Sequence, residues 1–255
     1  MHQLDKESGG FQEIVVYEAA QLFGETGKFR FLQFSDQAVQ GAVDLNNPGR
    51  IVLEYPRAII HVMECNRPSF ENVFMIGHGI GTIASHYPDK RFKVAEIDGN
   101  VVELSRRYFD YRADNVEIGD GRHLLGKEEA GRLDYIIVDA FTRKGTPTHL
   151  TSLEFMKLTN EKLGSRGSLI MNLMGKPKGD RLINAIYSTL GEIYPYRTAL
   201  SLRGAGEELR NIIVVGSSGA IECDSRELAG FEVIELDEGH IIWDSPHGDF
   251  LERIF

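Results

Sequence analysis

Apolar and polar positions alternate along the first part of the chain, and continuous apolar runs replace this alternation further on. β-Branched and aromatic residues mixed with polar ones occupy residues 13–19, 28–34 and 41–45, and the turn signal NNPG follows at 46–49. This pattern predicts a small antiparallel β-meander. Residues 51–66, with Pro56 near their start, predict a helix that links the meander to the rest of the chain.

From residue 70 onwards, short apolar runs alternate with segments of helical character. Strands are predicted at 72–77, 92–98, 115–119, 134–140, 168–173, 197–202 and 211–217, and the helices between them include 99–112, 152–163 and 179–193. Continuous apolar strands indicate a sheet that is covered on both faces. The alternation of strands and helices predicts an α/β fold with a Rossmann-like, doubly wound, mostly parallel seven-stranded sheet.

We expect three regions along the chain. Residues 1–65 form a small N-terminal β-meander domain with the linking helix, and residues 66–219 form a Rossmann-like, nucleoside-binding catalytic domain. Residues 220–255 form a C-terminal extension that packs on this domain. The extension carries Trp243, the single tryptophan, and its sequence assigns it no role.

Composition narrows the classes of function. The formal net charge of the 255 residues is −10, which argues against nucleic acid as a partner and is compatible with a cationic substrate. No apolar run approaches the ~20 residues that cross a bilayer, so we expect no membrane partner. Two cysteines make no disulfide framework and no metal-ligand spacing occurs, so we expect a reducing cytoplasm and no metal.

Glycines follow the first strand of the predicted parallel sheet. Gly77, Gly79 and Gly81 stand in the segment GHGIGT, and glycines at such a place let the backbone turn tightly and approach a ligand. The spacing is G-x-G-x-G rather than the G-x-G-x-x-G of dinucleotide sites, so a purely structural turn is an equal interpretation.

Carboxylates end the next three strands, at the edge of the sheet where ligands bind in this class of fold. Glu96 is placed to accept hydrogen bonds from both hydroxyls of a ribose, whereas Asp98 is equally suited to cap the following helix. Asp120, followed by Gly121, can accept from an exocyclic amine or cap a helix, and Asp139 ends the fourth strand. Four such strand ends in succession predict a ligand of the nucleoside type.

Together these segments resemble the spermidine synthase family, aminopropyltransferases built on the fold of class I S-adenosylmethionine-dependent methyltransferases. The resemblance is carried by GGFQEIVVYE (9–18), EYPRAIIH (54–61), GHGIG (77–81), EIDGNVVELSRRYF (96–109), GDGRHLL (119–125), DYIIVDAF (134–141) and THLTSLEF (148–155). The glycine loop and strand ends are shared by many methyltransferases. The N-terminal segment and the pattern VDAF…P-x-x-L-x-x-x-E-F are more specific to the family.

The resemblance implies a cytoplasmic transferase of polyamine biosynthesis, assembled as a homodimer. It would move an aminopropyl group from decarboxylated S-adenosylmethionine to an amine such as putrescine, with the aspartate of the fourth strand assisting deprotonation of the amine. By the same resemblance, Asp139 is the catalytic residue. The cofactor-binding residues would be Gln12, Gly77, Gly79, Gly81, Glu96, Asp120 and Gly121, and the substrate-binding residues Tyr55, His61 and Thr142.

The chain departs from the family at two carboxylate positions. Ile80 stands where the family has an aspartate that binds the aminopropyl ammonium, and Thr142, followed by Arg143 and Lys144, stands where it has a second loop aspartate. Two alternatives therefore stay open. One is a methyltransferase that uses S-adenosylmethionine, whose carboxylate Ile80 would not repel, on a small molecule, and the other is a non-catalytic member that binds a nucleoside or a partner protein.

Overall fold

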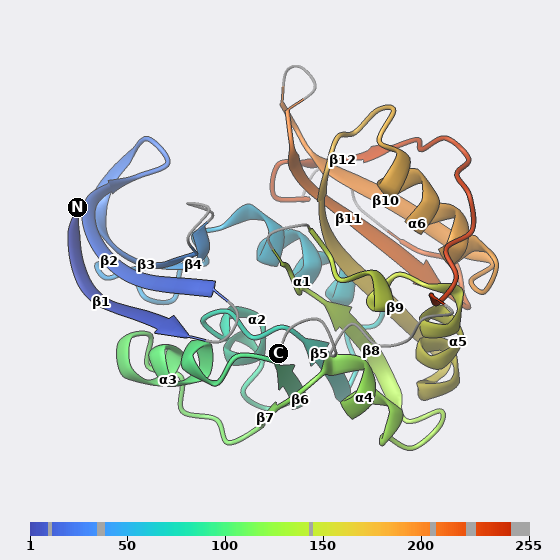
Figure 1. The fold of residues 1–255 in the computed structure, drawn as a ribbon, viewed down its shortest axis with the longest axis horizontal. Helices are drawn as coiled ribbons and strands as arrows, with labels where there is room; N and C mark the ends of the chain where they lie inside the picture. Colours follow the sequence, from blue (N-terminus) through green and yellow to red (C-terminus); the bar gives the residue numbers. More distant parts are fainter. Residues whose placement is uncertain (10–11, 35–38, 143–144, 205–207, 223–227, 246–255) are drawn as a thin grey trace.

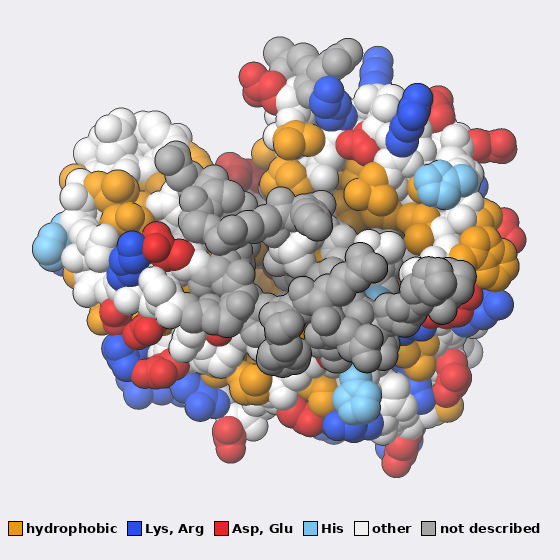
Figure 2. All heavy atoms as spheres, in the orientation of Figure 1, with side chains coloured by type: hydrophobic (Ala, Val, Ile, Leu, Met, Phe, Trp, Pro, Cys, Tyr) orange, Lys and Arg blue, Asp and Glu red, His pale blue; other side chains and the backbone are white. Residues whose placement is uncertain are grey.

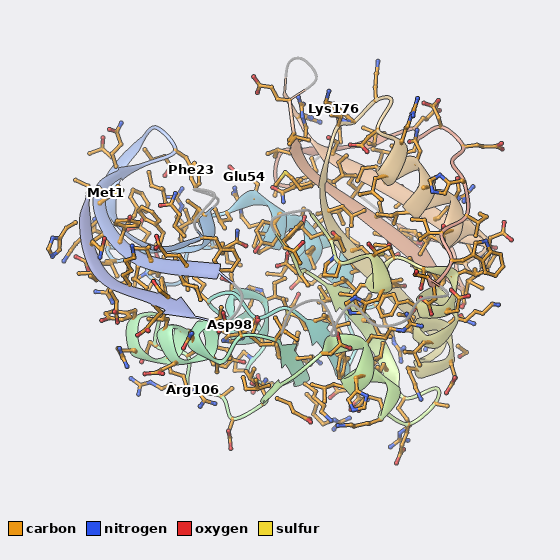
Figure 3. All side chains as sticks on the ribbon, viewed as in Figure 1. Met1, Phe23, Glu54, Asp98, Arg106 and Lys176 are labelled. Atoms are coloured by element: carbon orange, nitrogen blue, oxygen red, sulfur yellow. The ribbon has the colours of Figure 1, made fainter. Side chains whose placement is uncertain are left out.

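A curved N-terminal sheet and a larger α/β lobe make up the molecule (Figure 1). The computed structural model describes residues 1–9, 12–34, 39–142, 145–204, 208–222 and 228–245. Helix α1 (Glu54–Asn66) lies between the two parts, and Glu54 marks its first residue in Figure 3. A helix thus lies where the sequence predicted one, between the two sheets.

The N-terminal sheet has four strands in the order β1-β2-β3-β4, each antiparallel to the next. They are β1 (His2–Gly9), β2 (Gln12–Leu22), β3 (Glu25–Phe34) and β4 (Val39–Asp44). The predicted meander corresponds to β2, β3 and β4. The pattern missed β1 because HQLDKESG is a largely polar, exposed edge strand, held by backbone pairing with β2 rather than by apolar burial.

Apolar side chains attach this sheet to the larger lobe. The shared cluster joins β2 and β3 to the glycine loop and to α3 (Gly99–Tyr108), through Ile14, Val16, Leu32, Ile80, Val101 and Leu104. Polar contacts border it: Arg30 Nη1 donates to Tyr108 O at 2.7 Å, and the Tyr108 hydroxyl donates to Asp5 Oδ2 at 2.9 Å. The N-terminal sheet therefore forms one side of the region around the glycine loop.

The larger lobe contains an eight-stranded sheet within the described residues, in the order β12-β10-β11-β9-β8-β5-β6-β7. Its strands are β5 (Asn72–Ile76), β6 (Arg91–Glu96), β7 (Val116–Ile118), β8 (Leu133–Val138), β9 (Leu163–Gly175), β10 (Tyr196–Leu202), β11 (Arg210–Ser217) and β12 (Phe231–Ile234). Neighbours from β7 to β9 are parallel, and those from β9 to β12 are antiparallel. The sheet is thus mostly parallel, as predicted.

The eighth strand corrects the expected number of seven. β12 comes from the C-terminal extension and pairs antiparallel with β10, with Val233 opposite Leu200. Only Phe231 of this four-residue edge strand is fully buried, whereas Val233 is exposed. So short a strand with one buried side chain carries too little apolar pattern to be recognised in sequence.

Helices cover both faces of the larger sheet, as the apolar strands predicted. Besides α1 and α3 they are α2 (Thr82–His86), α4 (Gly121–Gly126), α5 (Leu153–Lys162) and α6 (Arg181–Gly191), with the 3-10 turn η1 (Thr148–Leu150) before α5. One apolar cluster lies under α4, α5 and α6, and the other under α1 and α2. Side-chain caps fix the starts of four helices: Asp98, Asp120, Ser152 and Asp180.

Acidic and basic side chains intermingle around the edge of the face shown in Figure 2. No extended basic surface is visible among the described residues on that face. None of the helices in the described ranges is long and apolar enough to cross a membrane.

Candidate active site

The glycine loop between β5 and α2 lies directly against the end of β8. Gly77 has a φ of +97°, and a Cβ at this position would lie 2.0 Å from Asp139 O. Gly81 has a φ of +81°, and a Cβ there would lie 2.2 Å from the Tyr111 ring. Glycine is therefore required at both positions by backbone conformation and by space. This close approach brings the first and fourth strand ends together.

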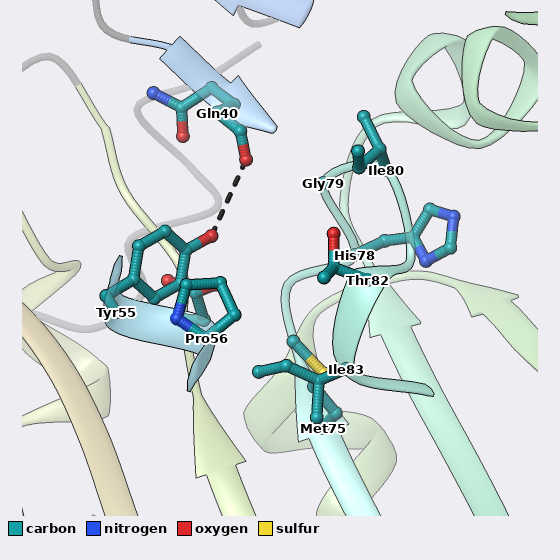
Figure 4. A pocket seen from close by; sticks show the side chains of 10 residues that line it. Gln40, Tyr55, Pro56, Met75, His78, Gly79, Ile80, Thr82 and Ile83 are labelled. Carbon is teal, nitrogen blue, oxygen red and sulfur yellow. Dashed lines mark hydrogen bonds between the residues drawn. The ribbon is translucent and has the colours of Figure 1, made fainter. Parts of the chain in front are cut away.

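A small pocket opens between this loop and the start of α1. Tyr55 and Pro56 lie on one side of it and the glycine loop with the first turn of α2 on the other (Figure 4). Its described lining is Gln40, Tyr55, Pro56, Met75, His78, Gly79, Ile80, Thr82, Ile83 and Asp139. Three residues predicted from sequence, Tyr55, Gly79 and Asp139, thus line one pocket.

Asp139 is surrounded by neutral hydrogen-bond donors. Asn172 Nδ2, from β9, donates to Asp139 Oδ1 at 2.8 Å, and Asn211 Nδ2, from β11, donates to Asn172 Oδ1 at 3.0 Å. This chain fixes the Asn172 amide with its NH₂ group towards the carboxylate. Burial raises the pKa of Asp139 above its ordinary value, and the hydrogen bonds from Asn172 and Tyr55 offset part of that rise.

Tyr55 connects the N-terminal sheet to this carboxylate. Its hydroxyl donates to Gln40 O, in β4, at 3.5 Å, and it lies close enough to Asp139 to lower the pKa of that carboxyl. Burial and the negative charge of Asp139 raise the pKa of Tyr55 well above the ordinary value. The phenol therefore stays protonated and acts as a hydrogen-bond donor at the mouth of the pocket.

Glu96 is buried at the end of β6, with 8% of its surface exposed. Its Oε2 accepts from His78 N at 2.8 Å, and its Oε1 accepts from Asp98 N at 3.0 Å. Burial raises the pKa of Glu96 to about 7, although these backbone donors favour the charged form. Asp98 caps α3, because its Oδ1 accepts from Asn100 N at 2.9 Å. Its capping role is thus confirmed.

Asp120 caps a helix, which is one of the two roles that the sequence left open, and it also contacts a histidine. Its Oδ1 accepts from His123 N at 2.8 Å and so caps α4, while its Oδ2 lies 2.8 Å from His149 Nε2. Burial acts to raise the pKa of Asp120, but the hydrogen bonds from His149 and the His123 amide outweigh it and hold the pKa below the ordinary value. Asp120 is therefore an ionised carboxylate at neutral pH.

The other predicted site residues, including Glu96 and Asp120, are not among the residues that line this pocket, and three of them have no described ligand-type setting. The Thr142 hydroxyl donates to Gly145 O at 2.9 Å within a tight turn, and Thr142 is not among the pocket-lining residues. His61 lies along α1, where its Nε2 is 3.3 Å from Cys65 Sγ. The backbone of Gln12 belongs to β2, but its side chain is outside the described part of the chain. The roles of all three remain predictions.

Other residues named from the sequence have packing roles or fall outside the structure. A Cβ at Gly121 would lie 2.3 Å from Ile76 Cγ2, so this glycine lets α4 start close to β5. Gly79 has a φ of +54°. Arg143, Lys144 and Cys223 lie outside the described residues.

Ile80 occupies an apolar setting. It is 8% exposed and belongs to the cluster that joins β2, β3 and α3. A Cβ at Gly41, in β4, would lie 2.5 Å from Ile80 Cγ1, so the glycine admits the isoleucine side chain. Ile80 therefore attaches the glycine loop to the N-terminal sheet.

His78 is a neutral histidine that joins the glycine loop to α3. Ser105 Oγ donates to Val102 O at 2.8 Å, so the 2.7 Å contact between His78 Nε2 and Ser105 Oγ requires the imidazole to donate. Burial and the nearby Arg106 charge lower the pKa of His78 to about 4. Its buried Nδ1 finds no partner among the described residues.

Sequence reasoning missed the residues that support the two carboxylates. Asn172 carried a signal, because it is a single amide within the otherwise apolar strand SLIMNL. Its partner Asn211 and the Asp120 partner His149 carried none, since their contacts join segments 39 and 29 residues apart. Within the described ranges, no three histidine, cysteine, aspartate or glutamate residues are grouped to hold a metal ion.

Comparison with solved structures supports the fold. A probable spermidine synthase from Corynebacterium glutamicum superposes with a TM-score of 0.79 at 19% identity, covering 95% of this chain and 96% of that one. A spermidine synthase in complex with the transition state analogue AdoDATO superposes with a TM-score of 0.67 at 18% identity, covering 99% and 88%.

Sequence comparison identifies the family. A polyamine aminopropyltransferase from Vibrio vulnificus is 30% identical over 202 residues, which span 73% of this chain and 64% of that protein. The chain thus aligns with slightly less than two thirds of the length of this relative. The spermine/spermidine synthase domain matches residues 53–185, just over half of the chain. The chain therefore belongs to the spermine/spermidine synthase family.

Proposed function

We propose that this protein transfers the aminopropyl group of decarboxylated S-adenosylmethionine to an amine such as putrescine. The observation that carries the proposal is Asp139, a partly buried carboxylate at a strand end that lines a pocket with Tyr55 and the glycine loop. Membership of the spermine/spermidine synthase family supports it, as does the likeness in fold to a spermidine synthase bound to AdoDATO.

The proposed reaction needs little from the protein beyond position and a base. The sulfonium already activates the adjacent aminopropyl carbon. The amine nitrogen forms a bond to this carbon while the carbon–sulfur bond breaks, and 5′-methylthioadenosine leaves with the bonding pair. Asp139 first holds the protonated amine and then accepts the proton that the attacking nitrogen must lose. A pKa raised by burial makes Asp139 a better acceptor for that proton than an exposed aspartate.

In this proposal the nucleoside lies along the ends of β5, β6 and β7. Glu96 accepts hydrogen bonds from the ribose hydroxyls, and Asp120 accepts one from the adenine amine. The glycine loop leaves room for the cosubstrate between these two carboxylates. Both carboxylates keep acceptor capacity for such contacts, because each oxygen has two lone pairs and the structure uses one.

Calorimetry followed by a transfer assay tests the function. The protein is titrated with 5′-methylthioadenosine, S-adenosylmethionine and decarboxylated S-adenosylmethionine, and transfer to putrescine is then measured. Preferred binding of the decarboxylated form and formation of spermidine support the proposal. Preferred binding of the carboxylated form would instead identify a methyltransferase, and binding without transfer would identify a non-catalytic member.

We also propose that the enzyme works in the cytoplasm as a homodimer, as the family resemblance implies. Light scattering coupled to size-exclusion chromatography tests the assembly: a mass near twice the 28.6 kDa of the chain is expected, and a mass near 28.6 kDa contradicts it.

A further inference from the structure

The segment after β12 is firmly docked beside the larger sheet. We call residues 236–244 the C-terminal strap; it runs past α6 to α5 along the edge of the lobe (Figure 1). Backbone groups of the strap bond both helices: Ile242 N donates to Thr189 Oγ1 at 2.9 Å, and Leu153 N donates to Ile242 O at 2.7 Å. The Ile242 side chain is 8% exposed and enters the core cluster under α4, α5 and α6. The strap is therefore part of the folded lobe.

The strap ends in an ion pair with α4. Arg122 Nη1 and Nη2 donate to Asp244 Oδ1 and Oδ2 at 2.8 and 2.7 Å, which is the bidentate geometry of a strong arginine–carboxylate pair. The Arg122 side chain is 24% exposed and that of Asp244 is 37% exposed. The hydrogen bond from Arg122 lowers the pKa of Asp244, and the same contact raises the pKa of Arg122. Both groups remain charged at neutral pH.

Arg122, held by Asp244, also contacts the loop that follows β8. Its Nη1 also donates to His149 O at 3.0 Å, in η1, at the end of the loop that begins at Asp139. The His149 side chain then reaches Asp120, with 2.8 Å between Nε2 and Oδ2. A continuous chain of contacts thus runs from Asp244 through Arg122 and His149 to Asp120.

The position of this chain gives it a consequence for binding. Asp120 directly precedes Gly121 and Arg122, so its carboxylate is held from both ends: by the α4 amide of His123 and by the side chain of His149. The contact from His149 leaves the remaining lone pairs of Asp120 in a fixed direction. A carboxylate that must accept a hydrogen bond from a ligand amine binds better when its orientation is set beforehand.

We propose that Arg122, His149 and Asp244 are positioning residues that orient Asp120 for the nucleoside, so that the C-terminal strap supports the cosubstrate half of the site. The inference rests on the proposed function, because it takes Asp120 to contact the adenine amine. It gives a role to the C-terminal extension, for which the sequence supplied none. It also separates the cosubstrate half of the site from the amine half around Asp139, because the described contacts of Asp139 include none of Arg122, His149 and Asp244.

Binding of 5′-methylthioadenosine tests the inference in the full-length protein. Arg122→Gln removes both the pair with Asp244 and the contact to His149, and we expect it to raise the Kd about tenfold, as for loss of a hydrogen bond to a charged group. Asp244→Asn should raise the Kd by about threefold, and the double variant should be no weaker than Arg122→Gln alone, because the two residues act through one contact.

Steady-state kinetics distinguish positioning from a general structural effect. We expect Arg122→Gln to raise the KM for decarboxylated S-adenosylmethionine about tenfold, with the KM for the amine and kcat within about twofold of wild type. Arg122→Lys keeps the charge without the bidentate geometry. Its KM for decarboxylated S-adenosylmethionine should therefore lie between those of wild type and Arg122→Gln. Glu25→Gln is the control, because Glu25 also forms an arginine–carboxylate ion pair, in which Arg50 Nη2 contacts Glu25 Oε1 and Oε2 at 2.7 and 2.6 Å, away from the nucleoside residues.

The outcomes separate the two proposals. Wild-type protein that binds 5′-methylthioadenosine, with Arg122→Gln and Asp244→Asn both within twofold of its Kd, overturns the positioning role and leaves the proposed function intact. Loss of kcat and of both affinities in equal proportion also overturns it, since that marks a structural defect. Wild-type protein that binds none of the three nucleosides overturns the proposed function itself. Near-ultraviolet circular dichroism confirms that each variant is folded before it is scored.

Discussion

Asp139 follows β8 and Asp120 follows β7 at the same edge of the sheet, but the two carboxylates are held in opposite ways. Asp139 is partly buried beside two neutral groups, Asn172 and Tyr55, and desolvation raises its pKa. Asp120 accepts from a backbone amide and from His149, and it connects to a bidentate ion pair, so its pKa is held below the ordinary value. One carboxylate is set up to take up a proton and the other to remain charged.

This difference shows how one fold produces two kinds of carboxylate. A base that releases its proton after each turnover needs a pKa closer to neutrality, which burial without a nearby cation supplies. A carboxylate that only accepts a hydrogen bond from a ligand needs constant charge and a fixed direction, which hydrogen bonds and ion pairs supply. The surroundings of each aspartate, not its residue type, therefore match it to a role.

The largest effect is expected from removal of the base. Asp139→Asn keeps the size of the side chain but cannot accept the proton, so kcat/KM should fall about 1,000-fold. The Kd for 5′-methylthioadenosine should stay within about twofold, because the nucleoside contacts lie on the other half of the site. Steady-state assays measure kcat/KM, and calorimetry measures the Kd. Turnover that survives in this variant would show that Asp139 has a structural role. The proposed difference in function between Asp139 and Asp120 would then be wrong.

A large effect on stability is expected at Gly77, the glycine that lets the end of β5 lie against the end of β8. Gly77→Ala places a Cβ 2.0 Å from Asp139 O at a φ of +97°, so the free energy of unfolding should drop by about 3 kcal/mol or more. Urea denaturation measures it. Gly126→Ala is the matched control, since a Cβ there meets nothing within 4 Å, and it should change stability by no more than about 1 kcal/mol. Equal effects from the two variants would contradict the packing argument.

A smaller effect is expected from the neutral support of the base. Asn172 donates to the ionised form of Asp139 and so lowers its pKa; Asn172→Leu should therefore raise that pKa further. Because the base acts when ionised, the acidic limb of the kcat/KM profile should move to higher pH. The loss of activity should therefore be greater at acidic pH than at alkaline pH.

The partner of Asn172 provides the control for this prediction. Asn211→Ala leaves the donor to Asp139 in place and removes only its orienting contact, so its pH profile should move less. An unchanged acidic limb in Asn172→Leu would show that Asp139 does not set the pH dependence.

The smallest effect concerns the pH dependence of nucleoside binding. Glu96 has a pKa of about 7, and only its ionised form accepts hydrogen bonds from both ribose hydroxyls with full strength. Affinity for 5′-methylthioadenosine should therefore rise about tenfold between pH 6 and pH 8 and then level off. Calorimetry at several pH values measures this. A flat profile would mean that Glu96 supports the glycine loop through His78 N instead of contacting the ligand.

The same pKa makes a prediction about stability with a defined sign. The folded-state pKa of Glu96 lies above the ordinary value of 4.5, so its protonated form stabilises the fold most below pH 4.5. This contribution is lost as pH rises through about 7. Thermal unfolding of wild type and Glu96→Gln between pH 5 and pH 8 should show that the wild-type dependence is the steeper.

Much of the candidate site could be predicted from sequence because its residues follow strands with clear patterns. Gly77, Glu96, Asp120 and Asp139 each lie at the end of a parallel strand or within two residues of it, and parallel strands bring their carboxyl ends to one edge. Ile80 could be recognised as a departure but not as a packing residue. Its partners in β2 and β3 are more than 40 residues away, and no local pattern specifies that contact.

The sequence by itself determined the order of strands and helices, the edge of the sheet that carries the site, and the carboxylates found there, because periodicity and strand-end composition are local. The tertiary structure alone decided the state of those carboxylates. Asn172 and His149 reach them from distant segments, and Asn211 and Asp244 reach their partners from still other segments. The direction of each pKa depends on the donors and on burial. Such contacts depend on distance in space, which the separation of residues along the chain does not record.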